Sequence, residues 1–299
     1  MFKNIIIYRI ADGWTPKITD VENGLQSMRF TPCGATQDES MGWVPPRGQK
    51  HGALVESVGG QWILRLQIET KVLPSSVVKR RAEERAEQIE ESSGKKLGRM
   101  AMKDLREQTM MELLPRAFTK LTSVPVWMDL ENKLVIIEAA SAAKADEVAV
   151  LLLSSLDALA IAPLQTEKSV PTTMAAWLID FDPPGRFDVD RECELKAMDE
   201  TQSLVRYARH NLVIEEVKRH VQNGKMPIKL ALTWASRVSF LLTDTLQIKK
   251  IKLLETVIEG NESQDENEDH FDGDVAITTG ELAKLIPDLI EALGGELVN

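Results

Sequence analysis

The stretch "ALVESVGGQWILRLQIETKVLP", residues 53–74, decides the fold class. Polar and apolar residues alternate along its second half, so that Leu64 and Leu66 fall on one side of an extended chain and the residues between them on the other. Gly59-Gly60 divides the stretch in two, which is typical of a tight β-hairpin turn. We therefore expect a hairpin with one face buried and the other in water.

Helical spacing replaces this alternation directly after the hairpin. The following residues are rich in Arg, Glu, Ala and Met. We expect one helix, capped by Ser75 or Ser76, to end near Gly94, and a second helix to run from about 96 to 114. Pro115 removes a backbone donor and should kink or end the second helix. The two helices predict a hairpin that projects from the sheet.

Strand patterns return after this helical hairpin, so we expect it to be an insertion in a sheet-containing domain. The predicted class is α+β, with sheet-and-helix modules. We expect a central body of residues 1–73 plus 121–166, an inserted helical tip of residues 74–120, and a C-terminal base of residues 167–299. In the base, Thr279 is expected to cap the final helix.

The stretch "FTPCGATQDESMGWVPP", residues 30–46, has the composition of a catalytic loop but is predicted to be structural. Prolines stiffen it, and Phe30, Trp43 and Val44 can anchor it. No histidine lies in a sequence pattern that would activate Cys33 as a nucleophile. The chain also has no Walker lysine loop, GxGxxG, GxSxG or HExxH motif. We expect no enzymatic activity and no cofactor.

The net charge of −10 is concentrated in one segment. Residues 255–274 hold nine carboxylates and no Lys or Arg. They resemble a calcium loop in composition only, because His270 stands where that loop needs glycine, so we expect an acidic loop and no metal. No apolar run is long enough to span a membrane, and we expect a cytoplasmic protein.

Basic residues gather between residues 206 and 229, which carry six Lys or Arg and two Asp or Glu. In "VRYARHNL" a strand would place Arg206 and His210 on one face, and Lys218 and Arg219 follow on a helix. Such side chains can contact DNA phosphates, or they can be an ordinary solvated surface. The candidate DNA contacts are Arg206, Arg209, His210, Lys218, Arg219 and Lys229.

Several separate strings resemble the bacterial recombination-associated RdgC family: "FKNIIIYRI", "MRFTPCGATQDESMGWVPP", "LLPRAF", "KLALTW" and "TGELAKLIPDLIEALGGE". They occur in the family's order over essentially the whole chain. The resemblance implies a nucleoid-associated protein that is not an enzyme. It implies a homodimer, joined head to head and tail to tail in a ring, that encircles double-stranded DNA without sequence preference, and it leaves single-stranded DNA open as a second ligand. It also implies restraint of RecA-promoted strand exchange.

The resemblance also implies roles for particular residues. Phe118, in "LLPRAF", matches the aromatic residue of the family at the contact between the two tips, with Leu114 beside it. The other interpretation is that Phe118 belongs to the core of the helical hairpin. Arg209 and His210 match a Lys-Gln pair in the DNA-contact segment of the family. His210 departs from that pattern, and its imidazole is mostly neutral above a pKa of about 6.5.

Two hypotheses follow. The first is a ring-shaped DNA-binding protein without sequence preference. The second is an acidic protein-interaction module that acts directly on a recombination or replication partner. Charge reversal at Arg209 and Lys218 distinguishes them, because only the first requires those cations.

Overall fold

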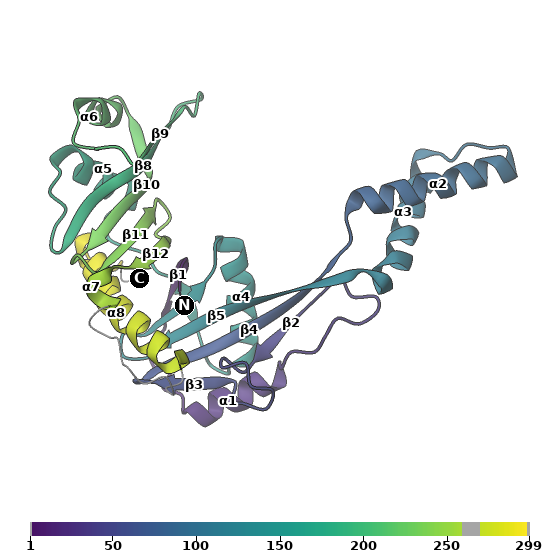
Figure 1. The fold of residues 1–299 in the computed structure, drawn as a ribbon, viewed down its shortest axis with the longest axis horizontal. Coiled ribbons are helices and arrows are strands. Elements are labelled where there is room, and N and C mark those ends of the chain that lie inside the picture. Colours follow the sequence, from purple (N-terminus) through teal and green to yellow (C-terminus); the bar gives the residue numbers. More distant parts are fainter. Residues whose placement is uncertain (1, 259–269, 298–299) are drawn as a thin grey trace.

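The computed structural model describes residues 2–258 and 270–297, which form a curved molecule (Figure 1). The central body lies at the bottom of the curve. The helical tip stands at the end of a long arm of the sheet on one side, and the base rises on the other. None of the described helices is long and apolar enough to cross a membrane.

The helical tip interrupts the chain of the central body once. The elements of the body are β1 (Ile5–Ile10), α1 (Ile18–Ser27), β2 (Glu39–Val44), β3 (Val55–Val58), β4 (Gln61–Val72), β5 (Phe118–Asp129), β6 (Leu134–Glu138), α4 (Ala142–Ser155) and β7 (Ile161–Pro163). The elements of the tip are α2 (Ser75–Ser93), α3 (Arg99–Leu113) and the short 3-10 turn η1 (Leu114–Arg116).

The base follows the body without interruption. Its elements are α5 (Val170–Asp180), β8 (Phe187–Ala197), β9 (Leu204–Ala208), α6 (Glu215–Gln222), β10 (Lys225–Trp234), β11 (Val238–Thr243), β12 (Ile248–Leu253), α7 (Glu255–Ile258) and α8 (His270–Ala292). The structure is therefore α+β, as the sequence predicts.

One antiparallel sheet of 12 strands runs through both the body and the base. Its order is β2-β4-β5-β6-β1-β12-β11-β10-β8-β9, with β3 beside β4 and β7 beside β1. Body and base meet where β1 pairs with β12, at Ile5 and Ile248. The backbone of Ile251 adds a hydrogen bond of 2.9 Å to the carbonyl of Lys3. The two parts therefore share a backbone hydrogen-bond network.

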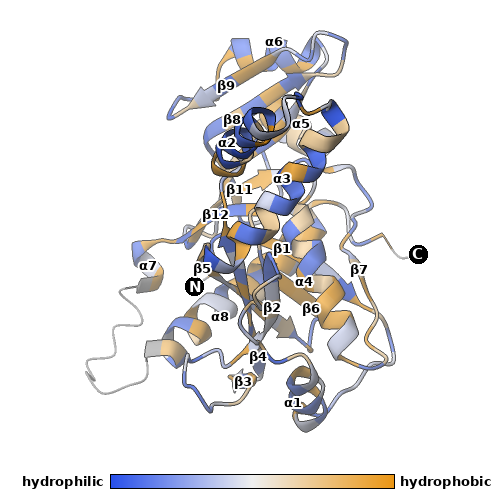
Figure 2. Ribbon diagram, turned by 90° about the vertical axis from the view of Figure 1, so that its right-hand side faces the viewer, coloured by the Kyte–Doolittle hydropathy of each residue, from blue (hydrophilic) through white to orange (hydrophobic). Residues whose placement is uncertain are grey.

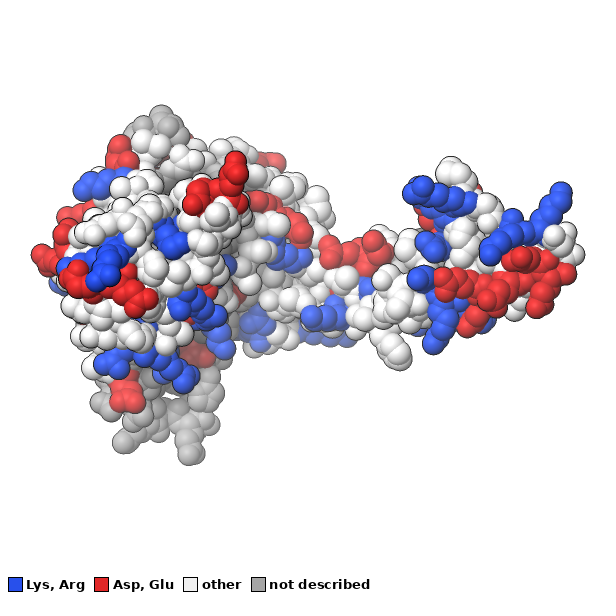
Figure 3. Space-filling view, turned by 90° about the horizontal axis from the view of Figure 1, so that it is seen from above, with Lys and Arg blue, Asp and Glu red and all other residues white. Residues whose placement is uncertain are grey.

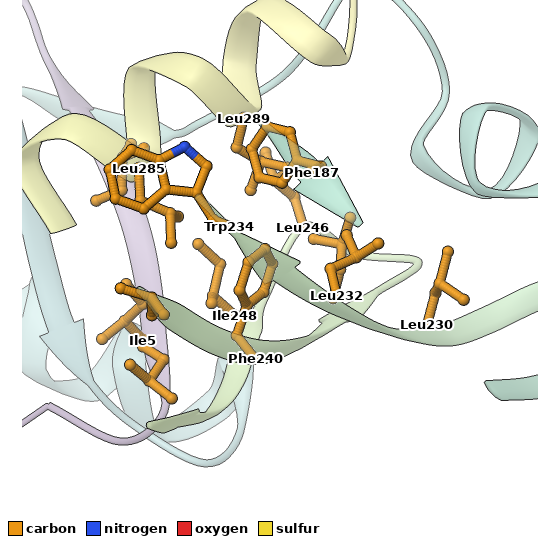
Figure 4. Close-up of a cluster of buried hydrophobic side chains, with 14 of the residues drawn as sticks. Ile5, Phe187, Leu230, Leu232, Trp234, Phe240, Leu246, Ile248, Leu285 and Leu289 are labelled. Carbon is orange, nitrogen blue, oxygen red and sulfur yellow. The ribbon is translucent and has the colours of Figure 1, made fainter. Parts of the chain in front are cut away.

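Helices cover the two faces of this sheet differently. In the body, one face packs on α1 and α4 around a core that contains Leu66, Val126 and Ile137. The other face continues into the base, where it packs on α5, α6 and α8 around Trp234, Phe240 and Leu285 (Figure 4). Strands near the middle of the sheet are the most hydrophobic, whereas α2 and α3 are mixed (Figure 2).

Polar contacts hold helix α8 and the residues after it against both the body and the base. Near its start, Asp272 accepts a hydrogen bond of 2.6 Å from Arg47 of the body. In the middle, Glu281 receives two hydrogen bonds of 2.7 Å from Arg237. Beyond its end, Glu296 pairs with Arg9 on β1. These contacts, together with the core, fix the angle between the two parts.

The expected loop at residues 30–46 contains a strand, so that part of the prediction is wrong. β2 pairs with β4, which places Trp43 opposite Leu66 and buries it completely. The indole nitrogen of Trp43 donates to Ser155 at 2.8 Å. A Cβ at Gly42 would lie 2.4 Å from the Cα of Phe30, so glycine is required there. The structural interpretation of this segment agrees with these contacts.

The tip helices occur where expected, but their ends differ. Pro74 occupies the N-cap position of α2, and neither Ser75 nor Ser76 makes the predicted cap. Gly94 ends α2 in a left-handed conformation, as predicted. Phe118 is the first residue of β5 and does not lie on a helix face, because the chain becomes extended directly after the turn that contains Pro115.

The final helix begins earlier than predicted, at His270 instead of Thr279. Thr279 is buried inside α8 and donates its hydroxyl to the carbonyl of Val275 at 2.8 Å. Packing of Val275 and Leu282 against the sheet outweighs the poor helix propensity of the Gly- and Asp-rich first turns. Residues 259–269 of the predicted acidic loop lie outside the described residues.

The Leu232→Ala substitution should lower the free energy of unfolding by about 2 to 5 kcal/mol, because the Leu232 side chain is fully buried in the core of the base. The matched control is Leu121→Ala on β5, where Leu121 is mostly exposed, and it should change stability by less than about 0.5 kcal/mol. Urea unfolding of both variants measures this. Equal losses of unfolding free energy in the two variants would contradict the placement of Leu232 in the core.

The Arg237–Glu281 pair should make stability depend on pH in the acid range. The hydrogen bonds from Arg237 hold the pKa of Glu281 below its usual range. The contribution of the pair is therefore complete above a pH of about 4.5 and is lost as the pH falls through the lower pKa of the folded state. Glu281→Gln should cost about 1 to 2 kcal/mol at neutral pH, and less in acid.

Urea midpoints at neutral pH and in acid test this expectation. Glu291→Gln, an exposed change on the same helix, is the control. A loss on Glu281→Gln that is the same at both pH values would show that the ion pair does not contribute as described.

Candidate nucleic-acid interface

None of the helices in the described residues covers one face of the base strands. Side chains of one alternation, such as Cys193, Leu195 and Leu230, are buried against α5, α6 and α8. The other alternation, which includes Glu192, Glu194 and Lys229, points away from these helices. In Figure 1 the helices lie on the outer side of the base, so this helix-free face looks along the inner side of the curve towards the helical tip.

Five charged side chains cross the helix-free face in a row, which we call the charge ladder. Its members are Arg206 on β9, Glu192 and Glu194 on β8, Lys229 on β10 and Lys250 on β12. Glu194 lies directly opposite Arg206 on one neighbouring strand and Lys229 on the other. The sheet register therefore places one carboxylate between two cations.

The distances in the charge ladder are those of ion pairs. Lys229 Nζ lies 2.7 Å from Glu194 Oε2, and Arg206 Nε lies 3.5 Å from Glu194 Oε1. Arg206 Nη2 also lies 3.3 Å from Glu192, which receives Lys250 Nζ at 2.8 Å. The hydrogen bond from Lys250 is the main reason that the pKa of Glu192 is lowered. Three cations thus share two carboxylates on one face.

The strand prediction for Arg209 and His210 is wrong. β9 ends at Ala208, and Arg209 turns the chain with a φ of 55°. Both side chains are exposed in the turn that leads to α6. His210 Nδ1 lies 2.7 Å from the carbonyl oxygen of Asn211. Because a carbonyl only accepts, Nδ1 carries the proton, and Nε2 is left as an acceptor whenever the ring is neutral.

Lys218 and Arg219 lie on α6, on the other side of the sheet from the charge ladder. Val217 and Val221 turn one side of α6 into the core, which leaves Arg219 exposed. Beside α6, the buried ring of Tyr207 lies 5.7 Å from that of His210. Burial, followed by the neighbouring Glu216 carboxylate, raises the pKa of Tyr207 to about 12.

The six candidate DNA contacts therefore form two groups. Arg206 and Lys229 belong to the charge ladder, whereas Arg209, His210, Lys218 and Arg219 surround the corner between β9 and α6. Lys250 and the two carboxylates of the ladder were not predicted from the sequence. The alternation of Glu192 and Glu194 in "RECELKA" was a usable signal, because it places both on one face of a strand. Viewed from above, Lys, Arg, Asp and Glu are interspersed over the base and the tip (Figure 3).

The two candidate interface residues of the arm differ in exposure. The Phe118 residue is 88% exposed, opposite the half-exposed Val72 on β4, so Phe118 is not part of a hairpin core. Leu114 is 7% exposed, and its carbonyl accepts a hydrogen bond from Lys71. A groove of about 530 Å³ lies at the root of the helical hairpin, between residues that include Leu73 and Met110.

Cys33 is held by Glu69, whose carboxylate accepts a hydrogen bond of 2.6 Å from the backbone of Cys33. Burial and this carboxylate raise the pKa of the Cys33 thiol, which disfavours a reactive thiolate. In the part of the chain that the structure describes, no three or more His, Cys, Asp or Glu side chains converge as a metal site. Residues 265–269 of the segment compared with a calcium loop lie outside the described residues.

Comparisons with known proteins cover the whole chain. A family model described as "Putative exonuclease, RdgC" matches residues 1–296. A protein of Dechloromonas aromatica (strain RCB) named Recombination-associated protein RdgC is 44% identical over 302 residues, which is 100% of this chain and 99% of the relative. Proteins of the same name from Cupriavidus pinatubonensis and Bordetella pertussis are 42% and 39% identical, each over 99% of this chain and 98% of the relative.

The family description mentions an exonuclease, whereas the names of these relatives mention recombination. Neither name assigns an activity to particular residues. The length of the match and the identity of the relatives agree with the separate sequence strings that first suggested the family. The chain belongs to the RdgC family of recombination-associated proteins.

Proposed function

We propose that this protein binds DNA without sequence preference, as a ring-shaped dimer that closes around the duplex. The observation that carries the proposal is the curved shape, with the cations of the charge ladder on its inner side and an exposed aromatic residue towards its far end. Lys and Arg on a broad sheet face reach phosphates, which carry no sequence information. Arg209, His210, Lys218 and Arg219 extend this surface around the edge of the base.

Ring closure requires a contact at each end of the curved chain. Near the tip, Phe118 of one copy can enter the groove beside Leu73 of a second copy, and the reverse contact follows from two-fold symmetry. At the base, β9 is the last strand of the sheet, with Leu204 and the nearby Met198 largely exposed. Exposed apolar side chains at both ends support a head-to-head and tail-to-tail dimer.

A dimer that surrounds the duplex would occupy DNA that RecA needs for strand exchange. The names of the relatives associate them with recombination, which supports this step. The protein would then lie on the nucleoid. It requires no cofactor and no enzymatic activity in this role.

The alternative is a protein-interaction module that acts directly on a recombination or replication partner. The charge ladder favours this alternative, because its carboxylates already pair with its cations. DNA binding would then be incidental.

DNA affinity measured over a salt series, with the mass in solution, distinguishes the two functions. The first predicts a dimer whose log affinity for a random duplex falls linearly with log salt, with a slope of about −0.9 for each phosphate contact. Arg206→Glu with Lys229→Glu, which reverses two cations of the charge ladder, should abolish binding, and Arg209→Glu with Lys218→Glu, at the edge of the base, should weaken it. Lys17→Glu, at the start of α1 on the outer side of the body, should not. Absence of binding at low salt would refute the DNA-binding function.

Duplex recovered intact after incubation with Mg²⁺ is the result expected of a protein that is not a nuclease.

Phe118→Glu should weaken the dimer at least about 30-fold, because aromatic residues that fill a partner's pocket commonly contribute about 2 kcal/mol or more. Val150→Glu introduces the same charge at an exposed apolar position on α4 and should leave the dimer intact. Sedimentation equilibrium measures both. A dimer unaffected by Phe118→Glu would place the contact elsewhere.

A further inference from the structure

The charge ladder places carboxylates where a DNA-binding surface would place phosphates. Each of its cations already donates to an anionic oxygen: Lys229 to Glu194, and Arg206 and Lys250 to Glu192. Arg206 also forms an ion pair with Glu194. Carboxylate and phosphate oxygens accept hydrogen bonds from Lys and Arg in similar geometries. A phosphate that binds to this face must therefore displace a carboxylate.

Stability alone is a weak reason for this arrangement. Ion pairs with exposed members stabilise a fold only slightly, and Arg206 and Lys250 are both more than half exposed. Glu194, in contrast, is almost buried beneath its two cations and lies directly opposite both in the sheet. Its position is fixed by the backbone, so it holds Lys229 and Arg206 at defined points on the inner side of the curve.

We propose that Glu192 and Glu194 are built-in phosphate mimics that limit the affinity of this face for DNA. The inference rests on the proposed DNA-binding function and deepens it. Each ladder cation exchanges one anionic partner for another when DNA arrives, so each phosphate adds little to the affinity. When a phosphate leaves, each cation pairs again with its carboxylate. This exchange lowers the barrier to movement of the ring along the duplex.

The exchange also explains the placement of the two carboxylates between strands that supply cations. Across the sheet the ladder runs from Arg206 on β9, through the two carboxylates on β8, to Lys229 on β10 and Lys250 on β12. A DNA backbone passing across the face can therefore take over the cations one after another. Lys250 lowers the pKa of Glu192, so this carboxylate is ionised at neutral pH and competes with phosphate there.

Removal of the carboxylate charges tests the proposal. Glu192→Gln, Glu194→Gln and the double variant keep the shape of each side chain and free the cations. DNA affinity, measured by fluorescence anisotropy with a random duplex over a salt series, should rise at least about tenfold in the double variant at moderate salt. The slope of log affinity against log salt should steepen by about 0.9 for each additional phosphate that the variant binds.

Asp188→Asn is the matched control, because Asp188 lies on the same strand and the same alternation but forms none of the ion pairs of the charge ladder. It removes one negative charge and should leave the slope unchanged. Urea unfolding checks that Glu194→Gln still folds. If Glu194→Gln does not fold, Glu192→Gln, at a more exposed position, tests the proposal independently.

Three outcomes are decisive. Tighter binding and a steeper slope in the ladder variants, but not in Asp188→Asn, support the proposal. Unchanged or weaker binding, while the wild-type protein binds DNA, overturns this inference and leaves the proposed function intact. Absence of binding by every variant and by the wild-type protein at low salt overturns both.

Discussion

The pairing of β1 with β12 is the constraint on which the rest of the structure depends. Through it, strands from both ends of the chain form one antiparallel sheet, and α8 packs across the join. Contacts from Arg9, Arg47 and Arg237 hold α8 in place. Because the backbone hydrogen bonds of the two parts are shared, the base cannot rotate against the body without breaking the sheet. The curved shape is therefore a property of the fold.

The curved shape matters for the charge distribution, which looks unfavourable for DNA binding when only the net charge is considered. The net charge of −10 lies mostly in residues 255–274, so the rest of the chain is almost neutral. Affinity for a polyanion depends on the charges that the protein presents to it. On the helix-free face the charge ladder contributes three cations and two carboxylates at fixed positions. On our proposal, this ladder contacts phosphates weakly and repeatedly, as suits a protein that surrounds DNA.

Local patterns in the sequence predict the elements but not the contacts between distant elements. The hairpin at Gly59-Gly60 and the helix end at Gly94 follow from backbone preferences of single residues, and both are confirmed. The first turns of α8 were missed because tertiary packing overrides their poor helix propensity. The charge ladder depends on the register of strands far apart in the sequence, which no single segment specifies. The exposure of Phe118 likewise requires knowledge of where η1 ends and β5 begins.

Retention on an end-blocked duplex tests the central claim, that a closed ring surrounds DNA. The protein is loaded at low salt on a duplex that is tethered at one end, the free end is then capped with a bulky group, and salt is raised to abolish phosphate contacts. A ring whose tip contact is apolar should stay on the capped duplex and be lost from the uncapped one. Equal loss from both would show that the protein binds DNA from one side and does not encircle it.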